Sequence, residues 1–196
     1  MRTTKVTIGF FCFMMIFVLA GCLSNSAQNK RISRNLYAKG IKNQNELYAF
    51  FLAHNPEADK KMVREIAALY VSEAKMEGIN SDCAFVQMCL ETGFLCFGGL
   101  VTPDMHNYCG LGAINAEQPG ERFETMQLGV RAHIQHLHAY ATPESVKLNN
   151  ECIDNRYKYV LPRGKAPNIT DLTGTWASDS QYDQKLERLL MELENL

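Results

Sequence analysis

Apolar positions spaced three and four residues apart predict a mainly helical chain. The clearest case is 59–77, where a row of apolar side chains shares one helical face: Met62, Ile66, Leu69, Tyr70 and Ala74. Further helices are expected over three ranges: 45–54, 126–140 and 182–193. Strands and helices do not alternate along the chain, so a parallel sheet is not expected.

Two stretches interrupt this helical pattern. Residues 93–116 are rich in glycine and aromatic side chains, and they suit a small irregular or β-hairpin lobe. Residues 143–175 mix polar residues with proline and glycine and give no clear assignment. The expected fold class is therefore mainly α (α+β), a helical domain with one small lobe.

A short apolar helix between Gly78 and Gly93 ends on a single carboxylate, Glu91. Ser81 or Asp82 can cap its start, and Gly93 can close its end in the left-handed conformation. The negative end of the helix and the apolar neighbours both raise the pKa of Glu91. A carboxyl group that stays protonated near neutral pH suits a general acid in glycoside cleavage. The alternative is a surface glutamate at a helix end.

The N-terminus has the pattern of a bacterial lipoprotein signal. Arg2 and Lys5 precede an apolar run, 6–19, that is short for a membrane-spanning helix. The run ends in Leu-Ala-Gly-Cys at 19–22, which predicts cleavage before Cys22 and lipid attachment to it. The alternative is an ordinary secretory signal with an incidental cysteine.

These segments divide the chain into a signal peptide, 1–21, a lipidated tether, 22–44, and one domain, 45–196. We expect a protein of the bacterial cell envelope that is lipid-anchored to a membrane and faces the periplasm or the exterior. Whether this is the inner or the outer membrane stays open. The formal charge of −1 offers no basic excess for nucleic-acid binding.

The cysteines and histidines give no cofactor or metal prediction. Five cysteines follow Cys22, an odd number that cannot pair completely within one chain, and their spacings match no common zinc pattern. Their disulfide pairing stays open. His133 and His136 have no carboxylate at a metalloprotease spacing, although either could partner a cysteine in a less favoured nucleophile pair. No metal site and no cofactor are expected.

Five short sequence motifs occur in this chain in the same order as in a known family. They are 77–95 around Glu91, Asn-Tyr-Cys-Gly-Leu-Gly at 107–112, the helical segment 129–137, Arg-Gly-Lys-Ala-Pro at 163–167, and Trp-Ala-Ser-Asp-Ser-Gln-Tyr at 176–182. In this order they resemble bacterial glucosaminidases of glycoside hydrolase family 73. The resemblance runs from about residue 46 to the C-terminus.

The resemblance implies a lysozyme-like fold and hydrolysis of the β-1,4 bond after N-acetylglucosamine in peptidoglycan glycan strands. By the same resemblance, Glu91 is the general acid. The implied substrate-binding residues are Asn107, Tyr108, Trp176 and Tyr182. For Trp176 and Tyr182, packing in the core is an equal alternative.

The second catalytic group has three candidates. Glu124 and Asp179 are possible protein carboxylates, and the N-acetyl group of the substrate can assist in place of either. A retaining or an inverting outcome therefore stays open.

Two other functions fit the same sequence. A lytic transglycosylase of this fold would use one glutamate and release an anhydro product, and a non-catalytic lipoprotein would bind peptidoglycan without cleaving it. The expected partners are peptidoglycan and a membrane reached through Cys22. The oligomeric state and the recognition of other N-acetylglucosamine glycans are not decided by the sequence.

Overall fold

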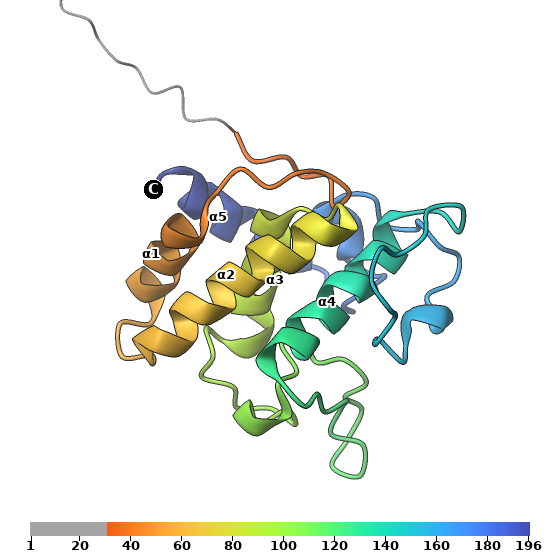
Figure 1. The fold of residues 1–196 in the computed structure, drawn as a ribbon, viewed down its shortest axis with the longest axis horizontal. Coiled ribbons are helices and arrows are strands. Elements are labelled where there is room, and N and C mark those ends of the chain that lie inside the picture. The colour runs from red at the N-terminus through yellow and green to blue at the C-terminus, as the bar shows by residue number, and fades with distance from the viewer. Residues whose placement is uncertain (1–30) are drawn as a thin grey trace, which may run out of the picture.

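The computed structural model describes residues 31–196, which form one helical body with an irregular lobe (Figure 1). The α-helices are α1 (Gln44–His54), α2 (Lys60–Glu77), α3 (Ser81–Thr92), α4 (Met126–Ala141) and α5 (Tyr182–Glu194). Three short 3-10 helices complete the described elements: η1 (Pro103–Met105), η2 (Tyr157–Tyr159) and η3 (Ile169–Leu172). Pairing of β type within 31–196 is limited to isolated bridges. The mainly helical fold class is confirmed.

The predicted signal peptide and the lipidation site Cys22 lie outside the described residues. Within 31–196, every helix is too short or too polar to cross a membrane.

Helix α3 lies at the centre of the helical body. It packs against α2 on one side and α5 on another, with further contacts to α1 and α4 (Figure 1). Every residue from Ser81 to Cys89 is buried, which is typical of a helix covered on all faces. Its largest apolar side chains, Phe85 and Met88, join Phe51 and Tyr70 in the main core.

The C-terminal end of α3 is as predicted, but its N-cap residue differs from the prediction. Gly93 closes the helix with a left-handed φ of 56°, as expected. The N-cap, however, is Asn80, whose side chain accepts hydrogen bonds from the N–H groups of Asp82 and Cys83. Asp82 is instead turned back toward the preceding segment, where it accepts from the N–H of Ile41 at 2.8 Å.

Residues 31–43, which the sequence interpretation places in the tether, lie against the helical body instead. Ile32 and Leu36 are buried. The N–H of Leu36 donates to the carbonyl of Pro167 at 2.8 Å, and the Asn80 amide donates to the carbonyl of Ser33 at 2.8 Å. The segment is polar in composition but places Ile32 and Leu36 inward, which composition alone does not show.

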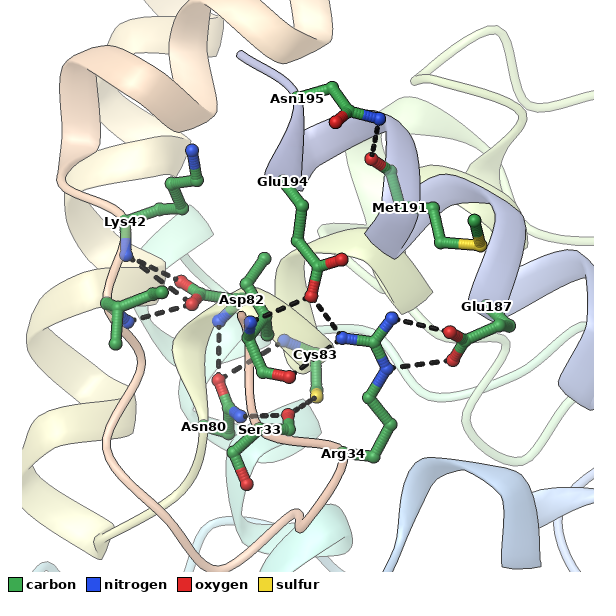
Figure 2. Close-up of polar contacts among 12 residues, drawn as sticks. Ser33, Arg34, Lys42, Asn80, Asp82, Cys83, Glu187, Met191, Glu194 and Asn195 are labelled. Atoms are coloured by element: carbon green, nitrogen blue, oxygen red, sulfur yellow. Dashed lines mark hydrogen bonds and ion pairs between the residues drawn. The ribbon is translucent and has the colours of Figure 1, made fainter. Parts of the chain in front are cut away.

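Arg34 fastens this segment to α5, as Figure 2 shows. Its guanidinium donates to both carboxylate oxygens of Glu187, at 2.8 and 2.5 Å, and also to Glu194. The N–H of Ile32 donates to the same Glu194 carboxylate at 2.8 Å. These groups are largely shielded from solvent, and Arg34 is the cation that hydrogen-bonds both carboxylates.

Replacing this guanidinium tests the contribution of the segment to stability. We expect Arg34→Met to lower the free energy of unfolding by about 2 kcal/mol, since it leaves two shielded carboxylates unpaired. Arg34 depresses the pKa of Glu187, so this stabilisation is present above the ordinary carboxyl pKa and is lost as pH falls through the depressed value. Urea unfolding at neutral and acidic pH measures both effects.

The control is Arg122→Met, because Arg122 forms an ion pair with Asp104 at 2.7 Å that is open to solvent. Exposed pairs contribute little, so stability should hardly change. Equal losses from the two variants would contradict the role given to Arg34.

Candidate active site

A pocket of about 220 Å³ opens at the C-terminal end of α3. Its lining comes from Glu91 and the turn that follows it, and from lobe residues that include Asn107 and Ala113. Glu91 is the single carboxylate among the described residues that line it. The pocket therefore lies between the helical body and the lobe, and Glu91 is the acidic group at its edge.

The turn after Glu91 has an unusual backbone. Gly93 is followed by Phe94, Leu95 and Phe97, which all have positive φ values between 54° and 62°. Such conformations cost of order 1–3 kcal/mol for each non-glycine residue and persist only where neighbours impose them. Here the amide of Asn55 donates to the carbonyl of Phe94 at 2.9 Å. The strain lies directly beside the pocket.

The lobe is held to the start of α4 by a close backbone approach. A Cβ atom at Gly129 would lie 1.7 Å from the carbonyl oxygen of His106, so only glycine fits there. The His106 ring bonds the carbonyl of Phe123 through Nδ1 at 3.0 Å. These contacts hold the residue that precedes Asn107, which lines the pocket.

Tyr182 from α5 contacts Glu91 directly. Its hydroxyl donates a hydrogen bond to Oε1 of Glu91, and it accepts one from the Gln87 side-chain amide at 2.9 Å. Tyr182 is buried at 5 % exposure, so it contacts the carboxyl group from the protein interior and not from the solvent side.

The surroundings raise the pKa of Glu91. Part of its side chain reaches solvent, but the enclosing protein removes hydration from the carboxyl group, and this desolvation is the largest cause of the shift. Hydrogen bonds from Tyr182 and Trp176 oppose it without cancelling it. The pKa shift is upward because hydration is lost at the carboxyl group itself. It agrees with the direction expected from the sequence.

Asn107 lines the pocket, but its amide is fully used inside the lobe. The NH₂ group donates to the carbonyls of Leu111 at 2.9 Å and Glu121 at 3.0 Å. The amide oxygen accepts from the N–H of Leu111 at 2.9 Å. Asn107 thus organises the loop that forms the wall, and substrate binding by it stays a prediction.

The other predicted substrate-binding residues lie in different settings. Tyr108 is buried at 3 % exposure within the core, so its ring is covered in this structure. Trp176 is half-buried, and its indole packs 5.2 Å from the rings of both His136 and Tyr140. A binding role for either residue remains a prediction, and Trp176 is the one with accessible surface.

The structure brings neither candidate for the second catalytic carboxylate into the pocket wall. Glu124 is exposed in the loop before α4. Asp179 lies at the surface near the start of α5, where it pairs with Lys185 at 2.6 Å and accepts from the N–H of Gln181. These contacts lower the pKa of Asp179. Whether either residue takes part in catalysis stays a prediction.

A chain of buried polar side chains is hydrogen-bonded to Glu91 through Tyr182. The sequence does not predict this chain. Gln87 bonds both Tyr182 and His133, and His133 bonds Tyr70. The available signal was Gln87 itself, a polar residue on the helical face of Glu91 in an otherwise apolar helix. Its partners come from distant segments and give no local signal.

The cysteines form no disulfide within the described residues. Cys83, Cys89 and Cys109 are buried, whereas Cys96 and Cys152 are exposed. The two ring nitrogens of His133 bond to Tyr70 and Gln87, so they leave none for a nucleophile pair with a cysteine. Residues 31–196 contain no cluster of metal-ligating side chains.

A helical domain with a glutamic acid of raised pKa at the edge of a pocket has the kind of group that a glycosidase uses as its acid. The family model for glucosaminidases, described as mannosyl-glycoprotein endo-beta-N-acetylglucosaminidase, matches residues 67–195. The chain therefore belongs to the glucosaminidase family, which indicates a glycoside hydrolase acting on peptidoglycan.

A protein from Borreliella burgdorferi described as uncharacterized is 42% identical over 171 residues, covering 87% of this chain and 82% of its own. No solved structure matches the chain.

The raised pKa of Glu91 has a consequence for stability. A carboxyl group whose folded pKa lies above its unfolded value loses stability as pH rises through that interval. Glu91→Gln removes this loss and retains an oxygen that can accept from Tyr182. We expect a higher melting temperature than wild type at neutral pH and no difference at pH values below the ordinary carboxyl pKa.

Melting curves across this pH range measure the effect, with Glu124→Gln at the exposed loop as the control. The control should match wild type throughout. A neutral-pH melting temperature that is unchanged or lower in Glu91→Gln would show that Glu91 is not destabilised when ionised.

Proposed function

We propose that this protein is an endo-N-acetylglucosaminidase that cleaves the β-1,4 bond after N-acetylglucosamine in peptidoglycan. The observation that supports this most strongly is the position of Glu91, at the pocket edge with its pKa raised and one oxygen held by Tyr182. Membership of the glucosaminidase family supports the same bond choice.

Glu91 acts as the general acid. Tyr182 occupies Oε1, so the acid proton is carried on Oε2 and passes to the glycosidic oxygen as the bond breaks. Desolvation keeps this proton in place closer to neutral pH than it would be on an exposed glutamate. The half-buried Trp176 is the aromatic residue proposed to pack against a sugar ring.

The substrate supplies the second catalytic group. Neither Glu124 nor Asp179 lines the pocket, and Asp179 is committed to Lys185. The N-acetyl group at C2 of N-acetylglucosamine can attack the anomeric carbon from within the substrate. One protein carboxylate is then sufficient for hydrolysis.

The protein acts from the cell envelope, tethered by lipid on Cys22. This part of the proposal is supported by the sequence pattern at 19–22 and by the location of the substrate. Because residues 31–43 lie on the domain, the spacer between lipid and domain is short, and cleavage takes place close to the membrane.

Digestion of purified sacculi tests the catalytic assignment. Wild type should release fragments with reducing N-acetylglucosamine ends, identified by reduction and mass spectrometry. Glu91→Gln should lose about 10²–10⁴-fold in rate, the usual contribution of a general acid. Glu124→Gln and Asp179→Asn are the matched controls and should retain activity within a few fold.

Other products point to other functions. Anhydro-muramyl ends would assign the protein as a lytic transglycosylase. Binding to sacculi without release of fragments would indicate a non-catalytic peptidoglycan-binding lipoprotein. Reducing N-acetylmuramic acid ends would contradict the proposed bond.

The anomer formed first tests whether the configuration is retained, as participation of the substrate requires. Attack by the N-acetyl group followed by water gives two inversions, so the β-anomer should appear first in proton NMR of a digested chitooligosaccharide or glycan fragment. An initial α-anomer would require a water activated by a protein base, and it would return Glu124 and Asp179 to consideration.

A further inference from the structure

Four consecutive hydrogen bonds link α2 to the catalytic carboxyl group through the core. Tyr70 Oη lies 2.8 Å from Nδ1 of His133, and Nε2 of His133 lies 3.0 Å from Oε1 of Gln87. The Gln87 amide nitrogen lies 2.9 Å from Oη of Tyr182, which bonds Glu91. Tyr70, His133 and Gln87 are fully buried, so water does not compete for these bonds.

The Tyr70 hydroxyl sets the direction of this chain. Within residues 31–196, its hydrogen-bond partner is His133 alone, and its ring is 0 % exposed. A buried hydroxyl hydrogen without an acceptor is costly, so the Tyr70 O–H donates to Nδ1. Nδ1 is then unprotonated, and a neutral imidazole must carry its hydrogen on Nε2.

His133 is held in this neutral form by its surroundings. Burial, together with the nearby ring of His136, lowers the pKa of His133 to about 3. The Nε2–H therefore donates to the Gln87 oxygen across the pH range in which a carboxyl group titrates. This fixes the orientation of the Gln87 amide, whose NH₂ faces Tyr182 and donates to its oxygen.

Tyr182 consequently has one direction left for its own hydrogen. Its oxygen accepts from Gln87, so its O–H points to Oε1 of Glu91. In the reversed chain, Tyr182 would donate to Gln87 and accept a hydrogen bond from protonated Glu91, which would bury the acid proton. The fixed direction excludes that arrangement.

We propose that Tyr70, His133 and Gln87 are positioning residues that fix the direction of the Tyr182 hydroxyl and thereby keep the acid proton of Glu91 on Oε2. The hydrogen-bond part of this inference stands on the geometry of the described residues. Its consequence for catalysis rests on the proposed function, in which Glu91 is the general acid.

Other titratable groups face this chain from neighbouring elements. The buried thiol of Cys109 in the lobe lies near Glu91, whose charge contributes to the raised pKa of that thiol. His136, on α4 with His133, is paired with buried Asp154 at 2.7 Å. Trp176 adds an uncharged N–H toward Glu91. None of these groups donates to or accepts from Tyr70, so they leave the direction of the chain unchanged.

The test variant is Tyr70→Phe in the full chain. It removes one hydroxyl, frees the tautomer of His133, and allows Tyr182 to turn toward Gln87. Because donation from Tyr182 lowers the pKa of Glu91, its partial loss should raise that pKa. The basic limb of the pH–rate profile should move to higher pH, with kcat reduced about fivefold and KM unchanged.

The matched control is Tyr157→Phe. The Tyr157 hydroxyl also bonds Nδ1 of a histidine on α4, His138, at 3.0 Å, but this pair has no connection to Glu91. It should leave the profile of wild type in place. Tyr182→Phe should move the limb in the same direction as Tyr70→Phe and further.

NMR supplies readouts that do not depend on activity. In wild type, ring-nitrogen shifts should show His133 protonated at Nε2 and bare at Nδ1, and carboxyl-carbon shifts follow the titration of Glu91. Both should change in Tyr70→Phe and not in Tyr157→Phe. If Tyr70→Phe does not fold, His133→Phe frees the Gln87 amide to turn its oxygen toward Tyr182 and should raise the pKa of Glu91 as well.

A proton on Nδ1 of His133 in wild type would overturn the inference. So would a pKa of Glu91 that responds to Tyr70→Phe no more than to Tyr157→Phe. If the Glu91 titration moves as expected while wild type cleaves no sacculi, the hydrogen-bond direction is supported and the proposed function fails instead.

Discussion

The burial of α3 on every side is the constraint on which the rest of this structure depends. A fully covered helix leaves no water for its polar side chains, so each must find a partner within the protein. Asn80 caps the helix and holds the segment before it, Asp82 accepts from the backbone of that segment, and Gln87 joins α4 to α5. The partners of one helix thus decide where the other elements lie.

Glu91 is the point at which this buried helix meets solvent. The same packing that covers the earlier turns withdraws hydration from the carboxyl group and raises its pKa. Immediately beyond it, Phe94 and Leu95 take left-handed conformations that direct the chain toward the lobe. The packing that surrounds α3 stabilises this strained turn, so acid and pocket wall arise from one local arrangement.

The sequence is sufficient for most local parts of this arrangement, although it predicts Ser81 or Asp82 as the N-cap of α3 where the structure has Asn80. Apolar periodicity located the helices, and Gly93 marked the end of α3. The family motif predicts Tyr182 as a substrate-binding residue and not as the hydrogen-bond partner of Glu91. His133 and Tyr70 are 46 and 63 residues from their partners in the chain. Long-range pairing of this kind depends on how helices cross, which no local pattern encodes. For the same reason, the packing of residues 31–43 was not foreseen.

The buried side-chain amides of Asn107 and Gln87 have different structural roles. Asn107 closes all its hydrogen bonds within the lobe and gives the pocket a fixed wall. Gln87 spans two helices, with its oxygen on His133 and its nitrogen on Tyr182. One end of an amide accepts hydrogen bonds and the other end donates them. The hydrogen bond that Gln87 accepts from His133 therefore determines that it donates to Tyr182. A fixed wall and a directed hydroxyl are what a single carboxylic acid needs in order to deliver its proton to one site.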